Sequence, residues 1–150
     1  MLKEHGELAA FQQLREDLVM SLISETKVAT GVEVSFLLMG DQYFAGINRQ
    51  AIIDRADRVE ILAYSNDPDQ IGTAVDGVSA DLDEMGKLVV GLQFYPPCTH
   101  SSAEMVACVE AATKRGISQF SYYNYGIAPR ANSPWVGDCI KYCTGCSSEG

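Results

Sequence analysis

The sequence predicts an α/β protein in which four parallel strands alternate with helices. Short runs of apolar and β-branched residues alternate with longer segments of helical periodicity, in the order of one helix and then four strand-helix units. Successive strands begin roughly thirty residues apart, the length expected of βαβ units with right-handed crossovers. The 150 residues, 47% of them hydrophobic, suit a single domain spanning 1–150.

The first thirty residues or so are expected to form an amphipathic helix that ends before Gly31. Its apolar residues recur at steps of three and four: Leu8, Phe11, Leu14, Leu18 and Leu22. The apolar run "VEVSFLLMG" (32–40) predicts the first strand, which Gly40 closes. The segment "NRQAIIDRAD" (48–57) predicts a short helix with Asn48 as its N-cap.

The second unit pairs the strand "RVEILAYS" (58–65) with a helix over 66–83, where Asp67 caps, Pro68 opens the first turn and Gln70 completes a capping box. The third strand, "KLVVGLQFY" (87–95), ends at two prolines, Pro96 and Pro97.

The third helix spans 101–116, with Ser101 and Glu104 as a second capping box and Gly116 at its C-terminal end. The fourth strand is "ISQFSYYNYG" (117–126). A short helix from Ser133 to about Cys143 is expected next, followed by a frayed tail over 144–150.

Side chains alternate between the two faces of a strand, so each strand divides into two sets. One set is apolar almost throughout and suits a face covered by helices: Val34, Phe36, Leu38, Val59, Ile61, Ala63, Val90, Leu92, Phe94, Phe120 and Tyr122. The other set becomes polar toward each strand's C-terminal end. A doubly wound sheet reads as apolar on both faces, whereas a barrel interior gives way to polar groups at its C-terminal mouth. The pattern therefore favours half of a (β/α)8 barrel.

Three strand ends carry a resemblance to a known architecture: "ILAYSNDPDQ", "GLQFYPPCTHSSAE" and "FSYYNYGIAPRANSPW". With the order of elements over nearly the whole chain, they resemble the C-terminal half of a (β/α)8 barrel in uncharacterised bacterial proteins related to sugar-processing hydrolases. The resemblance implies a ligand site at the C-terminal ends of the strands, but it specifies no reaction, because this fold supports many chemistries.

A complete barrel has eight strands in about 250 residues, and this chain supplies four. The first and fourth strands would then have open edges. We expect two copies to pair as a homodimer, since "VEVSFLLMG" carries no protective charge along most of its length; a fragment of a longer barrel and an open, flavodoxin-like sheet are the alternatives.

The net charge of -9 argues against nucleic acid and anionic membrane surfaces as partners. No apolar run is long enough to span a bilayer, the N-terminus is charged, and the five cysteines suit a reducing compartment, so a cytoplasmic location is expected. The sequence contains no Gly-rich phosphate-binding loop, and no cofactor is predicted.

The segment "CIKYCTGC" spaces Cys139, Cys143 and Cys146 as C-x3-C-x2-C, which resembles the iron-sulfur motif of radical S-adenosylmethionine enzymes. In that family the motif follows the first strand, whereas here it lies at the end of the chain. A zinc site that includes His100 is a second metal interpretation. We prefer cysteines that share no ligand, and predict no metal.

Candidate chemistry centres on one histidine and one carboxylate. His100 is the best general acid/base candidate, because an imidazole titrates near neutrality. Cys98 could act with it as a nucleophile, although no orienting acid is identifiable. Glycoside hydrolysis needs two carboxylates. Asp41 lies just beyond the first strand, while Glu60 falls near the beginning of the second strand and Asp67 is explained by capping.

The first functional hypothesis is that the chain binds a small polar, carbohydrate-like ligand in a cup at the C-terminal ends of the strands, with His100 or Asp41 as any acid/base. The expected ligand-binding residues are Tyr64, Gln93, Tyr95, Tyr123, Asn124 and Tyr125. The second hypothesis is a non-catalytic half-barrel module, or a truncated barrel, whose tyrosines pack an interface between copies.

Overall fold

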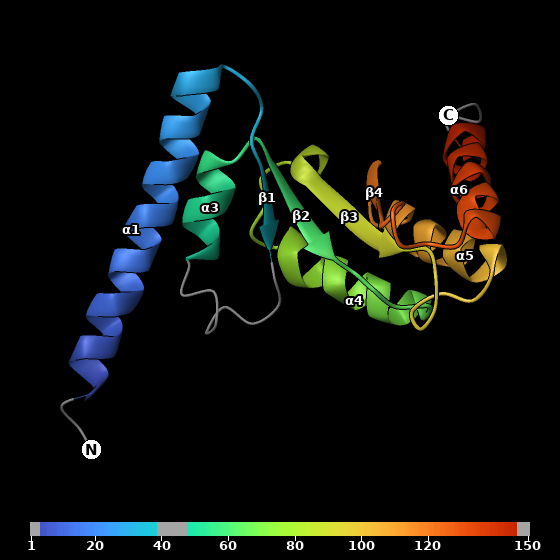
Figure 1. Ribbon diagram of the computed structural model, residues 1–150, viewed down its shortest axis with the longest axis horizontal. Coiled ribbons are helices and arrows are strands. Elements are labelled where there is room, and N and C mark those ends of the chain that lie inside the picture. The colour runs from blue at the N-terminus through green and yellow to red at the C-terminus, as the bar shows by residue number, and fades with distance from the viewer. Residues whose placement is uncertain (1–3, 39–47, 147–150) are drawn as a thin grey trace. The chain divides into compact units, whose positions relative to one another are not determined.

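A computed structural model describes residues 4–38 and 48–146 of the chain. Its strands are β1 (Ser35–Leu38), β2 (Arg58–Leu62), β3 (Leu88–Gln93) and β4 (Gln119–Tyr123), and Figure 1 shows how helices separate them along the chain. The four strands are parallel and lie in one sheet in the order β1-β2-β3-β4. The predicted α/β class is therefore confirmed.

The strand order distinguishes between the two parallel architectures considered. A flavodoxin-like sheet has the order 2-1-3-4-5, with a reversal next to the first strand. In this sheet each strand instead lies beside the next one along the chain, as strands do in a segment of a (β/α)8 barrel. The sequential order therefore agrees with the predicted half-barrel and not with the flavodoxin-like alternative.

The helices are α1 (Glu4–Thr30), α3 (Arg49–Arg55), α4 (Pro68–Ser79), α5 (Ser102–Thr113) and α6 (Ser133–Cys146), with short 3-10 turns η1 (Met85–Lys87) and η2 (Arg130–Asn132). Three predicted N-caps are confirmed: Asn48 accepts from the Ala51 amide, Asp67 from the Asp69 amide and Ser101 from the Glu104 amide. Gly116 has φ 87°, in the left-handed region that favours glycine after a helix.

Several predicted boundaries are wrong; β2, for example, ends at Leu62 and not at Ser65, and α4 ends at Ser79 and not at Asp83. Helix α6 continues to Cys146, so residues 144–146 are helical and not part of a frayed tail. Strand β4 ends at Tyr123, three residues before the predicted end at Gly126, because Asn124 begins a turn in which its carbonyl accepts the Ile127 and Ala128 amides.

The chain packs as two compact units, Met1–Val59 and Glu60–Gly150. In the first unit, α1 packs against α3 and buries Met20 and Ile23, while α3 buries Ile52 and Ile53. Lys27 at the end of α1 forms an ion pair of 2.7 Å with Asp57, whose other carboxylate oxygen accepts the Val34 amide at 2.8 Å.

The periodic residues that predicted α1 are exposed in the structure, with 54% of Leu14, 60% of Leu18 and 66% of Leu22 accessible. The helix itself is confirmed. Its buried face is the one with Met20 and Ile23, because the short α3 covers only that part of the helix surface.

The second unit contains a core built around β3, whose six residues are all buried. Helix α4 contributes Ile71 and Val75 to this core, and α5 contributes Met105 and Val109. Neighbouring helices α4 and α5, and α5 and α6, pack against each other. Along the described part of the chain, no helix combines the length and the apolar character needed to cross a membrane.

Candidate functional site

The predicted division of the strands into two faces is visible in the second unit. Ile61, Ala63, Val90, Leu92 and Phe94 are all at least 94% buried, as expected of the set that faces the helices. The opposite set comprises Glu60, Leu62, Tyr64, Gly91, Gln93, Tyr95, Ser121 and Tyr123, and we call it the inner face. Its β3 and β4 members are in register, since Gly91 pairs with Ser121 and Gln93 with Tyr123.

Two tyrosines of the inner face stack on each other at the C-terminal ends of β2 and β4. The rings of Tyr64 and Tyr123 lie 5.4 Å apart between centroids, at an interplanar angle of 26°. Strands on either side of a third strand are about 10 Å apart, so both rings lean over β3. The β3 residue at this level is Gln93, which is 9% exposed. Tyr123 keeps 44% of its surface accessible.

Burial raises the pKa of the Tyr64 hydroxyl, and Tyr123 and Glu60 raise that pKa further. The phenol therefore stays protonated at neutral pH and can donate a hydrogen bond. Tyr95 packs edge-on against Phe94, with ring centroids 6.3 Å apart.

A second polar pair lies deeper on the inner face, across the middle of the sheet. The Ser121 hydroxyl of β4 donates to Oε1 of Glu60 on β2. Both groups lie above Gly91 of β3, where a Cβ would be 2.9 Å from Glu60 Oε1 and 3.2 Å from Ser121 Oγ. The missing side chain at Gly91 therefore leaves space for a carboxylate-hydroxyl contact between strands that are not neighbours.

Glu60 is the third of the five residues of β2, in the middle of the strand. From the sequence, Glu60 was expected near the beginning of the strand without a functional role, and Ser121 was assigned to the same face but not to the site. A signal was present: a glycine inside an apolar strand often marks the close approach of another group.

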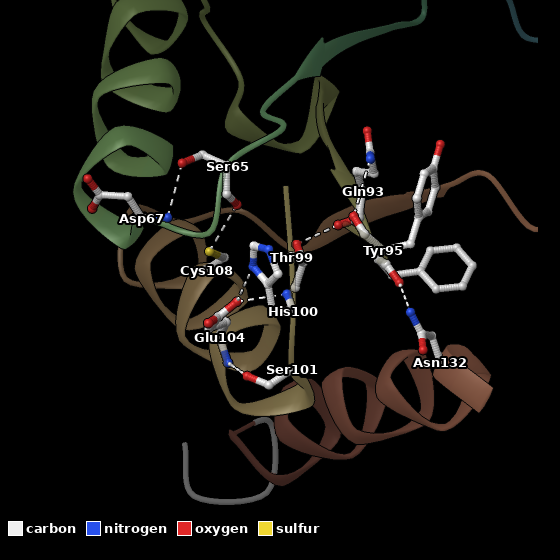
Figure 2. Close-up of polar contacts among 11 residues, drawn as sticks. Ser65, Asp67, Gln93, Tyr95, Thr99, His100, Ser101, Glu104, Cys108 and Asn132 are labelled. Atoms are coloured by element: carbon white, nitrogen blue, oxygen red, sulfur yellow. Dashed lines mark hydrogen bonds and ion pairs between the residues drawn. The ribbon is translucent and has the colours of Figure 1, made fainter. Parts of the chain in front are cut away.

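Two buried polar residues fix the loops that follow β3 (Figure 2). The Thr99 hydroxyl donates to the Gln93 carbonyl at 2.6 Å, and the Asn132 side-chain amide donates to the Phe94 carbonyl at 3.0 Å. Thr99 is 3% exposed and Asn132 is 9% exposed. The Gln93 side chain donates to the Tyr95 carbonyl at 3.2 Å. These bonds hold the backbone that carries Gln93 and Tyr95.

The structure places His100 at the N-terminus of α5, next to Glu104 (Figure 2). The Glu104 carboxylate accepts the His100 amide at 2.8 Å and lies 3.6 Å from the imidazole Nδ1. The backbone hydrogen bond from His100 is the main cause that lowers the pKa of Glu104, and a hydrogen bond from Asn66 lowers it further. The His100 imidazole is 55% exposed and contacts the carboxylate of Glu104 at the start of α5. It is therefore part of a helix cap, whereas Tyr64 and Tyr123 stack on each other.

The other predicted site residues lie at the end of β4 or outside the described part of the chain. Asn124 follows a cis Tyr123-Asn124 peptide bond, and its side chain accepts the Gly126 amide at 3.0 Å, so it closes a turn. Tyr125 is 80% exposed. Asp41 lies outside the described residues, so the structure does not place it.

The cysteines of "CIKYCTGC" are arranged along one continuous helix, α6. Cys139 is fully buried and shares a hydrogen bond with Tyr122, and burial raises the pKa of its thiol to about 12. Among the side chains that the structure describes, no group of three metal-ligating residues is close enough to hold an ion.

A cavity in the first unit lies between α1 and α3. It is lined by Glu16, Asp17, Met20, Ser21, Ser24, Ala51 and Arg55. Polar groups of its wall already bond within α1: Ser24 donates to the Met20 carbonyl, Ser21 to Glu25, and Asp17 accepts from Gln13. The inner face of the second unit is therefore the better candidate for a ligand site.

No family model matches this sequence, and no curated protein or solved structure is significantly similar to it.

Proposed function

We propose that the chain binds a small polar, carbohydrate-like ligand on the inner face, at the C-terminal ends of β2, β3 and β4. The observation that supports this most is the Tyr64-Tyr123 stack, which offers a partly exposed aromatic surface beside polar groups at the end where parallel α/β folds bind ligands. Sugar rings present apolar C–H faces and peripheral hydroxyls, and tyrosine matches both with its ring and its hydroxyl.

The proposed contacts follow from the positions of the side chains. Tyr123 provides the exposed ring surface, Tyr64 supports that ring from the other side and supplies a protonated hydroxyl, and Tyr95 borders the strand ends. Gln93 forms the floor beneath the two rings, and its carbonyl and amide are held by Thr99 and by the Tyr95 carbonyl. Asn124 and Tyr125 extend the surface beyond β4. The proposed activity is binding, without an assigned reaction.

Calorimetric titration of a panel of monosaccharides and sugar acids tests this proposal. Tyr123→Ala should weaken binding about tenfold or more, since an aromatic contact of this kind contributes about 1–3 kcal/mol including its buried area. Phe11→Ala is the matched control, because Phe11 is an exposed aromatic side chain of the other unit, and binding should not change. Binding that is equal in both variants, or no binding by any sugar, contradicts the proposal.

A second function, pairing of two copies, is favoured by the burial of β4. Within the described sheet β4 pairs on one side only, and none of its five residues is fully buried, in contrast to every residue of β3. Tyr125 and Ile127, just beyond β4, are 80% and 63% exposed. An open strand edge beside exposed apolar side chains is a ready surface for another strand.

Light scattering of the protein at several concentrations tests for this pairing. We expect the mass of a homodimer or a higher homo-oligomer, and Ile127→Lys should shift the protein toward the monomer. Val28→Lys, which places the same charge on an exposed side chain of α1, is the control and should leave the mass unchanged. A monomer at all concentrations would exclude pairing but would leave the proposed ligand site intact.

A further inference from the structure

The Glu60 carboxylate lies on the inner face, and no basic residue in the described part of the chain forms an ion pair with it. Among the described residues, its hydrogen-bond partner is the Ser121 hydroxyl, which occupies Oε1. Glu60 and Ser121 are both only partly buried, so water reaches them. Oε2 remains available to a donor from a ligand.

The rest of the inner face has the same electrostatic character. From Glu60 toward the C-terminal ends of the strands its other members are Leu62, Tyr64, Gly91, Gln93, Tyr95, Ser121 and Tyr123, none of which is basic. Arg58, two residues before Glu60 on β2 and therefore on the same side of the sheet, forms an ion pair of 2.9 Å with Glu33. Aromatic rings attract cations through the negative potential of their faces. A net charge of -9 adds a field that concentrates cations and repels anions. A carboxylate, a pair of stacked tyrosines and the overall charge therefore favour the same kind of ligand.

The spacing along the sheet limits the size of that ligand. Ser121, which holds the carboxylate, and Tyr123, which offers the exposed ring, are two residues apart on β4. Residues two apart in a strand are separated by about 6.6 Å. A single sugar-sized molecule can therefore contact the carboxylate with one substituent and the tyrosine ring with its own ring.

We propose that the ligand of the inner face is a protonated amine that carries a hydroxylated ring, such as an amino sugar, with its ammonium group on Glu60 and its ring on Tyr123. This inference depends on the proposed function, and it narrows the ligand class from polar sugars in general to cationic ones. The Ser121 hydroxyl positions the carboxylate, and Gly91 provides the space in which the two groups meet.

The test compares three probes of similar shape by calorimetric titration: glucosamine, which is cationic, and glucose and N-acetylglucosamine, which are neutral. Glucosamine should bind about tenfold more tightly than either neutral sugar, because a hydrogen bond to a charged group contributes more than a neutral one. The preference should decrease as salt is added.

Two variants with the same change in net charge locate the effect. Glu60→Gln keeps the side-chain shape and an oxygen that can accept from Ser121, and it should remove the preference for glucosamine over glucose. Glu110→Gln neutralises a carboxylate that pairs with Lys114 on the surface of α5, and it should leave the preference intact. Ser121→Ala keeps the charge on Glu60 and should also retain a preference.

The possible results separate this inference from the proposed function. Equal binding of glucosamine and glucose would overturn the inference and leave carbohydrate binding in place. Preferential binding of glucuronate that is lost in Arg130→Ala would also overturn the inference and leave carbohydrate binding in place. It would identify the exposed Arg130, between β4 and α6, as the charged contact. No binding of any probe would overturn both.

Discussion

Replacing Thr99 with valine tests how the loop after β3 is held. Valine has nearly the same shape as threonine, so the substitution mainly removes the hydroxyl that donates the hydrogen bond. The Thr99 hydroxyl donates to the Gln93 carbonyl at 2.6 Å, and the side chain is 3% exposed. Water therefore cannot replace the lost donor without a rearrangement of the loop.

The expected loss of stability follows from this geometry. A buried hydrogen bond contributes about 0.5–1.5 kcal/mol net, and a buried acceptor left without a partner costs about 1–3 kcal/mol. We expect the free energy of unfolding to fall by about 2 kcal/mol. For a chain of this length, that corresponds to a decrease in Tm of roughly 4–8 °C.

Unfolding in urea, followed by the fluorescence of the single tryptophan, Trp135, measures this change in the second unit. Thr73→Val is the matched control: Thr73 donates to the Asp69 carbonyl at 2.9 Å on the exposed surface of α4. The control should change stability by no more than about 0.5 kcal/mol. If Thr99→Val were as stable as Thr73→Val, the Gln93 carbonyl would not depend on Thr99 and the reasoning would be refuted.

Two further predictions concern ionisable groups of the second unit. The pKa of Glu104 is lower in the folded chain than its ordinary value of 4.5, so its stabilising effect is complete above that value and is lost as the pH falls below it. Stability measured from pH 6 down to about pH 3 should therefore decrease less in Glu104→Gln than in the wild type, and parallel pH profiles would contradict this. Burial raises the pKa of the Cys108 and Cys139 thiols to about 11 and about 12. Both should resist iodoacetamide at pH 8 until the protein is unfolded, as measured by mass spectrometry of the peptides, and rapid labelling of Cys139 in the native protein would show that the buried position is wrong.

Features with local causes were predicted well from the sequence. The caps at Asn48, Asp67 and Ser101 were identified because a capping side chain bonds to an amide two or three residues away, so the whole interaction lies within a few consecutive residues. Ile61 and Val90 were correctly assigned to the buried face, because side chains alternate along any strand.

Features that join distant segments were missed or incomplete. The contact of Glu60 with Ser121 across Gly91 depends on the register of three strands, and the anchoring of β3 by Asn132 depends on a loop that returns from β4. Neither register nor the path of a loop is encoded in the spacing of single residues. The exposed leucines of α1 show the same limit, since periodicity predicts a helix but not which face meets a partner.

The sequence by itself determined the α/β class, the alternation of helices and strands, and the two chemically different faces of the sheet, because these follow from residue propensities and short-range periodicity. Only the tertiary structure decided that Tyr64 stacks on Tyr123, that His100 belongs to a helix cap, and that the Glu60 carboxylate meets the Ser121 hydroxyl in the middle of the inner face. The physical reason is that such contacts depend on which strands become neighbours and at what register, and that is settled by the packing of the whole sheet against its helices.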